Sequence, residues 1–186
     1  MDKMQGDKAR EYILDAAAHL VQEGGAEALS LPAIAAAADL DLGTVEAVFP
    51  TMDDLFSALI QRMFDTFVAQ VETTMGRDEA PGGWARAYVA ASFPPGEDNK
   101  FSEIAAALLS STLYKPELIQ PLRDRQPDLQ SAMFSDGIDP LDAAILRLAV
   151  DGLWVNRMFR IDAVPREMER QVLDRLTAMA TSPSSG

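Results

Sequence analysis

The chain has 186 residues, of which 48% are apolar and 24% charged, as expected for a folded protein with one large domain or two smaller ones. It has no cysteine and one histidine, His19, which excludes disulfides, thiolate catalysis and cysteine-bound metals and leaves little for a zinc site or a catalytic triad. Its net charge of −13 disfavours non-specific attachment to nucleic acid or anionic lipid.

The N-terminal segment carries charges throughout and lacks the apolar stretch of a secretory signal. The longest run of small apolar residues, at 33–38, is too short to span a bilayer. We therefore expect a cytoplasmic protein.

Helical periodicity dominates the sequence, and no segment has the alternating pattern of a strand. Gly24 and Gly25 end the first helix, Ser30 with Pro32 begins the second, and Asp41 begins the third. Thr51 and Asp54 have the spacing of a capping box for a long fourth helix. These four helices are expected at about 7–22, 31–38, 42–48 and 51–74.

The second part of the chain has the same periodicity, so we expect an all-α protein of about nine helices. The later helices are expected near 84–92, 99–113, 116–134, 141–161 and 165–180. Pro121 and Pro127 should kink or divide the helix that contains them. We expect an N-terminal domain over residues 1–52, a larger helical domain over 53–182 and a disordered tail at 183–186.

The first three helices, with a tight turn between the second and third, are typical of a helix-turn-helix module. In such a module the third helix can enter the DNA major groove while the second crosses the backbone. Three blocks carry a more specific pattern: ARxxILxAAxxLVxEGG at 9–25, LSLPAIAAAADLDLGTV at 29–45 and FPTMDDLF at 49–56. Together they resemble the N-terminal domain of the TetR family of transcriptional regulators.

The resemblance covers about the first 60 residues, and the remainder, including 137–154, is similar to that family's second domain only in outline. It implies a dimeric, ligand-responsive regulator that binds operator DNA, with a small-molecule cavity in the helical second domain. We expect no catalytic residues, cofactor or metal site, because no nucleophile–base set, phosphate loop or metal-ligand spacing is visible. Arg147 and Asp151, four residues apart, are expected to form an ion pair within a helix.

The sequence departs from the family at three positions that commonly contact phosphates. A tyrosine, a histidine and a lysine are usual there, and this chain has Glu46, Val48 and Met52 instead. Between Glu11 and Gln61 there are nine acidic residues and no lysine or arginine. The remaining DNA-contact candidates are Lys3, Lys8, Arg10, Ser30, Thr44, Val45 and Ala47.

Among these candidates, the Ser30 and Thr44 hydroxyls could reach phosphates, and Val45 or Ala47 could touch a thymine methyl group. Glu46 could accept from cytosine N4, but without phosphate contacts to set the register such readout would specify little. We therefore predict a weakened DNA-binding surface. The alternative is a protein of this fold that has lost DNA binding and acts through a protein partner, a heterodimer or a bound apolar ligand. A simpler interpretation of the acidic residues is that they form a solvated surface, on which some, such as Asp41, cap helices.

Aromatic and methionine side chains of the second domain are candidates to line an apolar ligand pocket, although each is individually more typical of a core. They are Trp84, Tyr88, Phe101, Met133, Phe134, Trp154 and Met158. The helix expected at 141–161 is apolar nearly all round, so a second copy should cover part of it. The homodimer-interface candidates are Leu146, Val150, Leu153, Val172, Leu176 and Met179.

Overall fold

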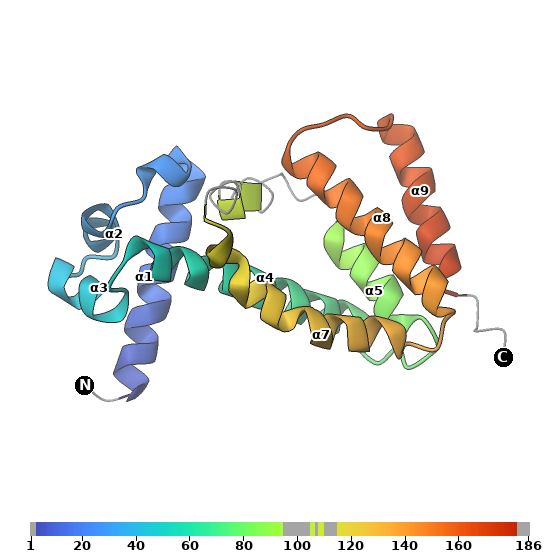
Figure 1. The fold of residues 1–186 in the computed structure, drawn as a ribbon, viewed down its shortest axis with the longest axis horizontal. Helices are drawn as coiled ribbons and strands as arrows, with labels where there is room; N and C mark the ends of the chain where they lie inside the picture. Colours follow the sequence, from blue (N-terminus) through green and yellow to red (C-terminus); the bar gives the residue numbers. More distant parts are fainter. Residues whose placement is uncertain (1–2, 95–104, 107, 110–114, 182–186) are drawn as a thin grey trace. The chain divides into compact units, whose positions relative to one another are not determined.

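A computed structural model describes residues 3–94, 105–106, 108–109 and 115–181 (Figure 1). Its regular elements over these residues are eight α-helices and two short 3-10 helices, which confirms the predicted all-α class. They are α1 (Lys3–Gly24), η1 (Ala26–Ala28), α2 (Leu31–Ala37), α3 (Leu42–Val48), α4 (Met52–Met75), α5 (Gly83–Ser92), η2 (Pro116–Ile119), α7 (Gln120–Phe134), α8 (Pro140–Met158) and α9 (Arg166–Met179). Most of the helix expected at 99–113 lies outside the described residues.

The helix expected at 116–134 is divided, as predicted, into η2 and α7, and the division falls next to Pro121. Pro121 lies in the first turn of α7, where no intrahelical partner awaits its missing N–H group. The helix continues through Pro127 to Phe134. Helix α8 ends earlier than expected, at Met158, and Arg160 follows with a φ of 54° in the left-handed region.

The chain forms two compact units, and α4 contributes to both. Unit 1 comprises residues 1–63 and 98–123, and unit 2 comprises 64–97 and 124–186. The core of unit 1 is built from the inner faces of α1, α2, α3 and the first half of α4. Its largest fully buried side chains are Ile13, Leu14, Ile34, Val45, Phe49, Leu55, Ile60 and Leu108.

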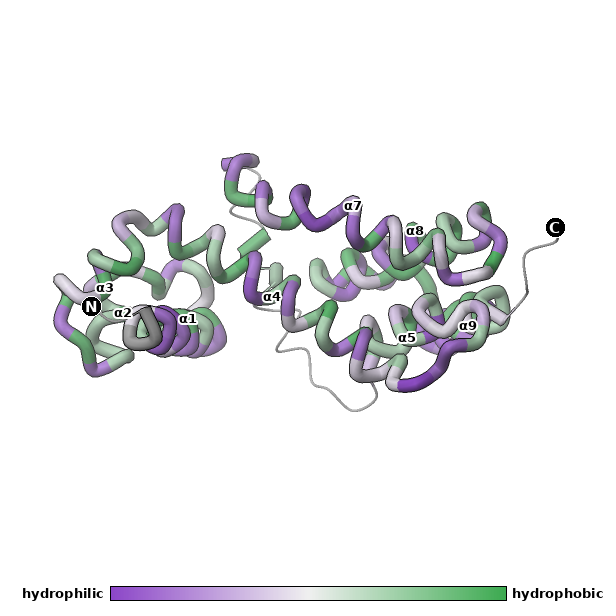
Figure 2. The backbone as a smooth tube through the Cα atoms, turned by 90° about the horizontal axis from the view of Figure 1, so that it is seen from below, coloured by the Kyte–Doolittle hydropathy of each residue, from purple (hydrophilic) through white to green (hydrophobic). Residues whose placement is uncertain are grey.

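In unit 2, α5, α8 and α9 pack against one another, and they are the green, orange and red helices of Figure 1. Met133 of α7 and Leu146 and Val150 of α8 are almost completely buried in its core. Figure 2 shows α7 coloured mostly as hydrophilic and α8 with long hydrophobic stretches. Within the part of the chain that the structure describes, no helix combines the length and the apolar character needed to cross a bilayer.

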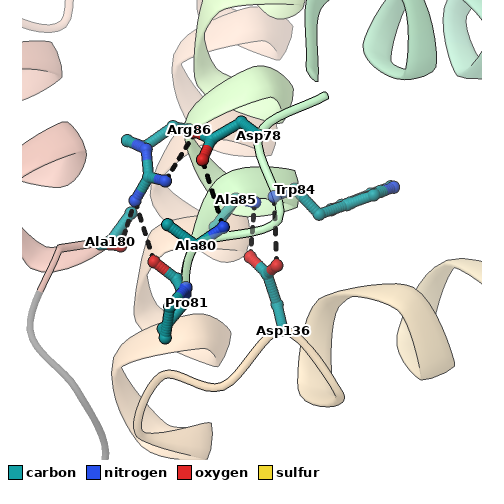
Figure 3. A network of polar contacts seen from close by, with 8 residues as sticks. All are labelled: Asp78, Ala80, Pro81, Trp84, Ala85, Arg86, Asp136 and Ala180. Atoms are coloured by element: carbon teal, nitrogen blue, oxygen red, sulfur yellow. Dashed lines mark hydrogen bonds and ion pairs between the residues drawn. The ribbon is translucent and has the colours of Figure 1, made fainter. Parts of the chain in front are cut away.

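A polar network closes one end of unit 2 (Figure 3). The Asp136 carboxylate, from the loop before α8, accepts hydrogen bonds from the backbone N–H groups of Trp84 (3.0 Å) and Ala85 (2.8 Å) at the start of α5. The Arg86 guanidinium donates to the carbonyl oxygen of Ala180 (3.0 Å), just after α9, and to the Asp78 carboxylate (2.6 Å). Three segments distant in sequence are therefore joined by charge-assisted hydrogen bonds.

Gly82 permits this close approach. Its φ of 81° lies in the left-handed region, and a Cβ atom there would lie 1.6 Å from the Ala180 carbonyl oxygen. No side chain fits at that distance, so the network requires glycine at this position.

Candidate functional site

Helices α2 and α3 begin at the capping residues that the sequence indicates. The Ser30 Oγ atom accepts from the Ala33 N–H (3.2 Å), and the Asp41 carboxylate accepts from the Thr44 N–H (2.9 Å). These bonds satisfy N–H groups that the first turn of a helix leaves without partners. Asp39, in the turn between the two helices, has a φ of 53°, which aspartate tolerates better than most residues.

Thr44 is tied to its cap by its side chain as well. Its hydroxyl donates to Asp41 (2.5 Å) and the backbone N–H bond adds to this, and together they hold the pKa of the Asp41 carboxyl below its ordinary value of 3.8. The hydroxyl proton is thus already committed to a carboxylate. Any phosphate that approached Thr44 would meet the negative charge of Asp41 beside it.

The exposed surface of α3 is narrow. Leu42, Gly43, Glu46 and Ala47 are exposed, with Leu42 at 38%. Val45 is completely buried in the core of unit 1, so its predicted contact with a thymine methyl group is wrong. The reason is helical geometry, since Val45 points away from the exposed side of α3 that carries Gly43, Glu46 and Ala47 and packs in the core of unit 1.

The start of α4 contains the predicted capping box. The Thr51 N–H donates to Asp54 (3.1 Å), and the Asp54 N–H donates back to the Thr51 hydroxyl (3.2 Å). Val48 and Met52, where phosphate-binding residues are usual in the family, are half-buried and pack against the core of unit 1. At these two positions the chain has apolar side chains that pack inward, where the family usually has polar groups that contact phosphates.

We call the nine acidic residues between Glu11 and Gln61 the acidic run. Basic residues from outside this run pair with some of its carboxylates in the folded chain. Arg62 donates to the Asp15 carboxylate (2.6 Å) and to the Leu14 carbonyl oxygen (2.7 Å), and Lys115 donates to Asp53 (2.6 Å). These pairs, 47 and 62 residues apart in sequence, were not visible in the sequence pattern. They occupy both cations with carboxylates of unit 1.

The α1 cations differ in their surroundings. The Arg10 guanidinium lies over the Phe49 ring, 4.9 Å from its centroid, whereas Lys8 is exposed. The side chain of Lys3 lies outside the described part of the structure. Lys8 and Arg10 are therefore the described α1 cations that remain as candidates for phosphate contact.

In unit 2, two of the predicted pocket residues, Trp84 and Tyr88, contact each other. Tyr88 stacks on Trp84 with ring centroids 5.3 Å apart and meets Phe67 edge-on at 5.4 Å. Met133 and Met158 are buried, and Trp154 is half-buried. Phe134 is 43% exposed at the end of α7, which contradicts its assignment to an enclosed pocket. Phe101 lies outside the described residues.

A polar chain adjoins these aromatic rings. The Tyr88 hydroxyl donates to Asp151, which also lies 3.7 Å from Arg147, as predicted for that i, i+4 pair. Arg147 in turn donates to Gln126 of α7. Burial, followed by the negative charge of Asp151, raises the pKa of the Tyr88 hydroxyl above its ordinary value of 10.0.

The predicted dimer residues are mostly core residues of unit 2. Leu146, Val150 and Leu176 are at most 4% exposed, so they cannot form an interface, and that prediction is wrong. Leu153, Val172 and Met179 are half-buried. Sequence reasoning missed a different set, on α8 and its C-cap residue Phe159, which we call the α8 seam. It consists of Leu141, Ile145, Leu148, Gly152, Val155 and Phe159.

The five large members of the α8 seam are between 42% and 72% exposed. With Gly152 included, the spacings along the seam alternate between four and three residues, which is the repeat of helices that pair along an apolar strip. That spacing was the available sequence signal. The buried residues Ala143, Leu146 and Val150 have the same three- and four-residue spacings, so spacing alone does not tell the two stripes apart.

Two family models match the chain. One, described as "Bacterial regulatory proteins, tetR family", matches residues 13–59. The other, "Tetracyclin repressor-like, C-terminal domain", matches residues 82–181. No curated protein matches the chain significantly.

Solved structures resemble it over most of its length. A transcriptional regulator from Rhodococcus sp. Rha1 is 22% identical, with 92% of this chain and 95% of that chain covered and a TM-score of 0.74. Multidrug binding protein EbrR complexed with ethidium is 27% identical, with 90% and 98% covered and a TM-score of 0.69. A TetR family member from Streptomyces coelicolor A3 is 28% identical, with 90% and 97% covered and a TM-score of 0.67.

Proposed function

Since the chain belongs to the TetR family of transcriptional regulators, we propose that it works as a ligand-responsive homodimer whose hold on operator DNA is weak. Membership of this family makes it a regulator rather than an enzyme. The observation that carries the weak-binding part of the proposal is the charge of unit 1, where the helix-turn-helix geometry is intact but the phosphate-binding groups are missing.

Electrostatic arithmetic supports weak binding. A hydrogen bond to a charged group contributes roughly 1.5–3 kcal/mol, and a two-fold dimer loses each one twice. A carboxylate at about 6 Å from a phosphate adds repulsion of roughly 0.7–3 kcal/mol for effective dielectric constants between about 80 and 20. Arg62 and Lys115 are paired with carboxylates of unit 1. Lys8 and Arg10 therefore remain to offset part of this loss and repulsion in each protomer.

The ligand we propose is a small, largely apolar molecule bound by unit 2. The aromatic cluster of Phe67, Trp84 and Tyr88 supports this, because stacked rings with one polar hydroxyl suit a flat organic molecule. Structures of the similar protein EbrR carry ethidium, malachite green or proflavin. A ligand that bound one separation of the two α3 helices more tightly than another would shift DNA affinity by that difference.

The homodimer is supported by the α8 seam. Five exposed large apolar side chains in one strip along α8 and its C-cap form the kind of patch that a partner commonly covers. Gly152 within the seam has no neighbour within 4 Å of an added Cβ, so a second helix can approach closely there. A second copy of the same helix supplies the matching repeat.

Binding to random duplex DNA in a salt titration starting at about 50 mM tests the DNA part of the proposal. The wild-type chain should bind DNA at low salt, and its affinity should fall steeply as the salt concentration rises. A variant with Glu46→Tyr and Met52→Lys should bind more tightly and with a steeper salt dependence. If only the variant binds, the fold is intact and the chain is the DNA-deficient regulator of the alternative hypothesis. If neither binds, DNA is not its partner.

A further inference from the structure

Glu46 is the one charged residue of α3, and it lies at the centre of the exposed surface of that helix. Leu42 precedes it by four residues on the same face, and Gly43 and Ala47 flank it. The buried Val45 fixes which way this face points, because its side chain holds the opposite side of α3 in the core of unit 1. If α3 enters a major groove, the carboxylate of Glu46 lies on the surface that faces the base edges.

The carboxylate of Glu46 also has no structural use. Three of its acidic neighbours are occupied: Asp41 caps α3, Asp54 forms the capping box with Thr51, and Asp53 pairs with Lys115. No hydrogen-bond or ion-pair partner of Glu46 is found among the described residues. The carboxylate of Glu46 is therefore an exposed hydrogen-bond acceptor that is available to a donor on the DNA.

We propose that Glu46 reads a cytosine in each operator half-site, an inference that rests on the proposed DNA-binding function. An ionised carboxylate accepts hydrogen bonds and donates none. In the major groove the donors are the amino groups of cytosine (N4) and adenine (N6), whereas guanine O6 and N7 and thymine O4 are acceptors. Adenine places its N7 acceptor beside N6, where it repels a carboxylate, so cytosine is the preferred base.

This assignment changes how the acidic surface of α3 should be interpreted. A carboxylate at this position repels the DNA phosphates, and this repulsion is the same for every DNA sequence. The contact with cytosine N4 is available only at matching sites, so Glu46 lowers affinity everywhere and restores part of it where a cytosine is correctly placed. The exposed Leu42 and Ala47 beside it suit the methyl group of a neighbouring thymine.

The test is selection from random duplex DNA at low salt with four forms of the full chain: wild type, Glu46→Ala, Glu46→Gln and the control Glu27→Gln. Glu27 is exposed on η1 and off the α3 surface, and its replacement removes the same charge from unit 1. Wild-type chain and the Glu27→Gln control should enrich cytosine at one position of each half-site. Replacing that base should weaken wild-type binding by about 5-fold, the low end of the usual range, because few phosphate contacts set the register.

Each variant has its own expected result. Glu46→Ala should lose the cytosine preference, and Glu46→Gln should move it to adenine, because an amide pairs with adenine N6 and N7 together. A selected motif that is identical in wild type and Glu46→Ala overturns the inference while leaving the proposed function in place. Failure of all four forms to retain any sequence removes the proposed function and the inference together.

Discussion

Replacing Leu148 by glutamate tests whether the α8 seam pairs two copies of the chain. Leu148 lies near the middle of the seam and is 72% exposed. Fully burying a leucine contributes about 1.5–3 kcal/mol, so covering the exposed part contributes about 1–2 kcal/mol in each protomer. A two-fold interface counts this twice, which makes about 2–4 kcal/mol per dimer, or roughly 30- to 1,000-fold in the dissociation constant.

Glutamate adds to that loss, because two carboxylates would have to leave water in the same apolar strip. We therefore expect Leu148→Glu to raise the dimer dissociation constant at least about 30-fold. Sedimentation equilibrium over a range of protein concentrations measures it, and far-ultraviolet circular dichroism checks that the helices remain. Tyr12→Glu is the matched control, since Tyr12 is 68% exposed on α1 in unit 1 and off the seam. Equal dissociation constants for wild type and Leu148→Glu, or a wild-type chain that stays monomeric at high concentration, would refute the reasoning.

Three further changes follow from the geometry. Asp136→Ala removes two hydrogen bonds to first-turn N–H groups of α5 and a helix-dipole contact, so it should lower the free energy of unfolding by about 1–3 kcal/mol in denaturant titrations. The control Asp162→Ala, at an exposed position, should change it little. Tyr88→Phe should destabilise the protein by roughly 1 kcal/mol near neutral pH. The folded state raises the pKa of Tyr88, so the wild type should lose stability as pH rises above 10.0, the ordinary value of a tyrosine. The stability difference between wild type and Tyr88→Phe should therefore shrink over that range. A constant difference would contradict this expectation. Asp39→Val should cost about 1–2 kcal/mol because a β-branched residue resists a positive φ, whereas Asp39→Gly should be tolerated in the same thermal-unfolding assay.

Local signals carried most of what the sequence could predict. The caps at Ser30, Asp41 and Thr51 act over three residues, so their partners stand beside them in the sequence. The helix boundaries around α2 and α3 follow from those caps. The same holds for the Arg147–Asp151 pair, which needs only helical spacing.

The inward face of α8 could not be predicted in this way. Leu146 and Ile145 are adjacent and equally apolar, yet Leu146 is fully buried and Ile145 is 45% exposed. Apolar character all round the helix leaves its rotation undecided, and the contacts with α5 and α9 decide it. Likewise, Arg62 and Lys115 reach the acidic run across 47 and 62 residues, distances over which sequence spacing carries no geometric information.

The network around Gly82, Arg86 and Asp136 has a dynamic consequence (Figure 3). It ties the loop before α5, the loop before α8 and the end of α9 to one another, so none of them can open without breaking hydrogen bonds to another. Amide hydrogens in these three segments should therefore exchange with solvent deuterium as one foldon, with a common opening free energy, although more than ninety residues separate the most distant pair.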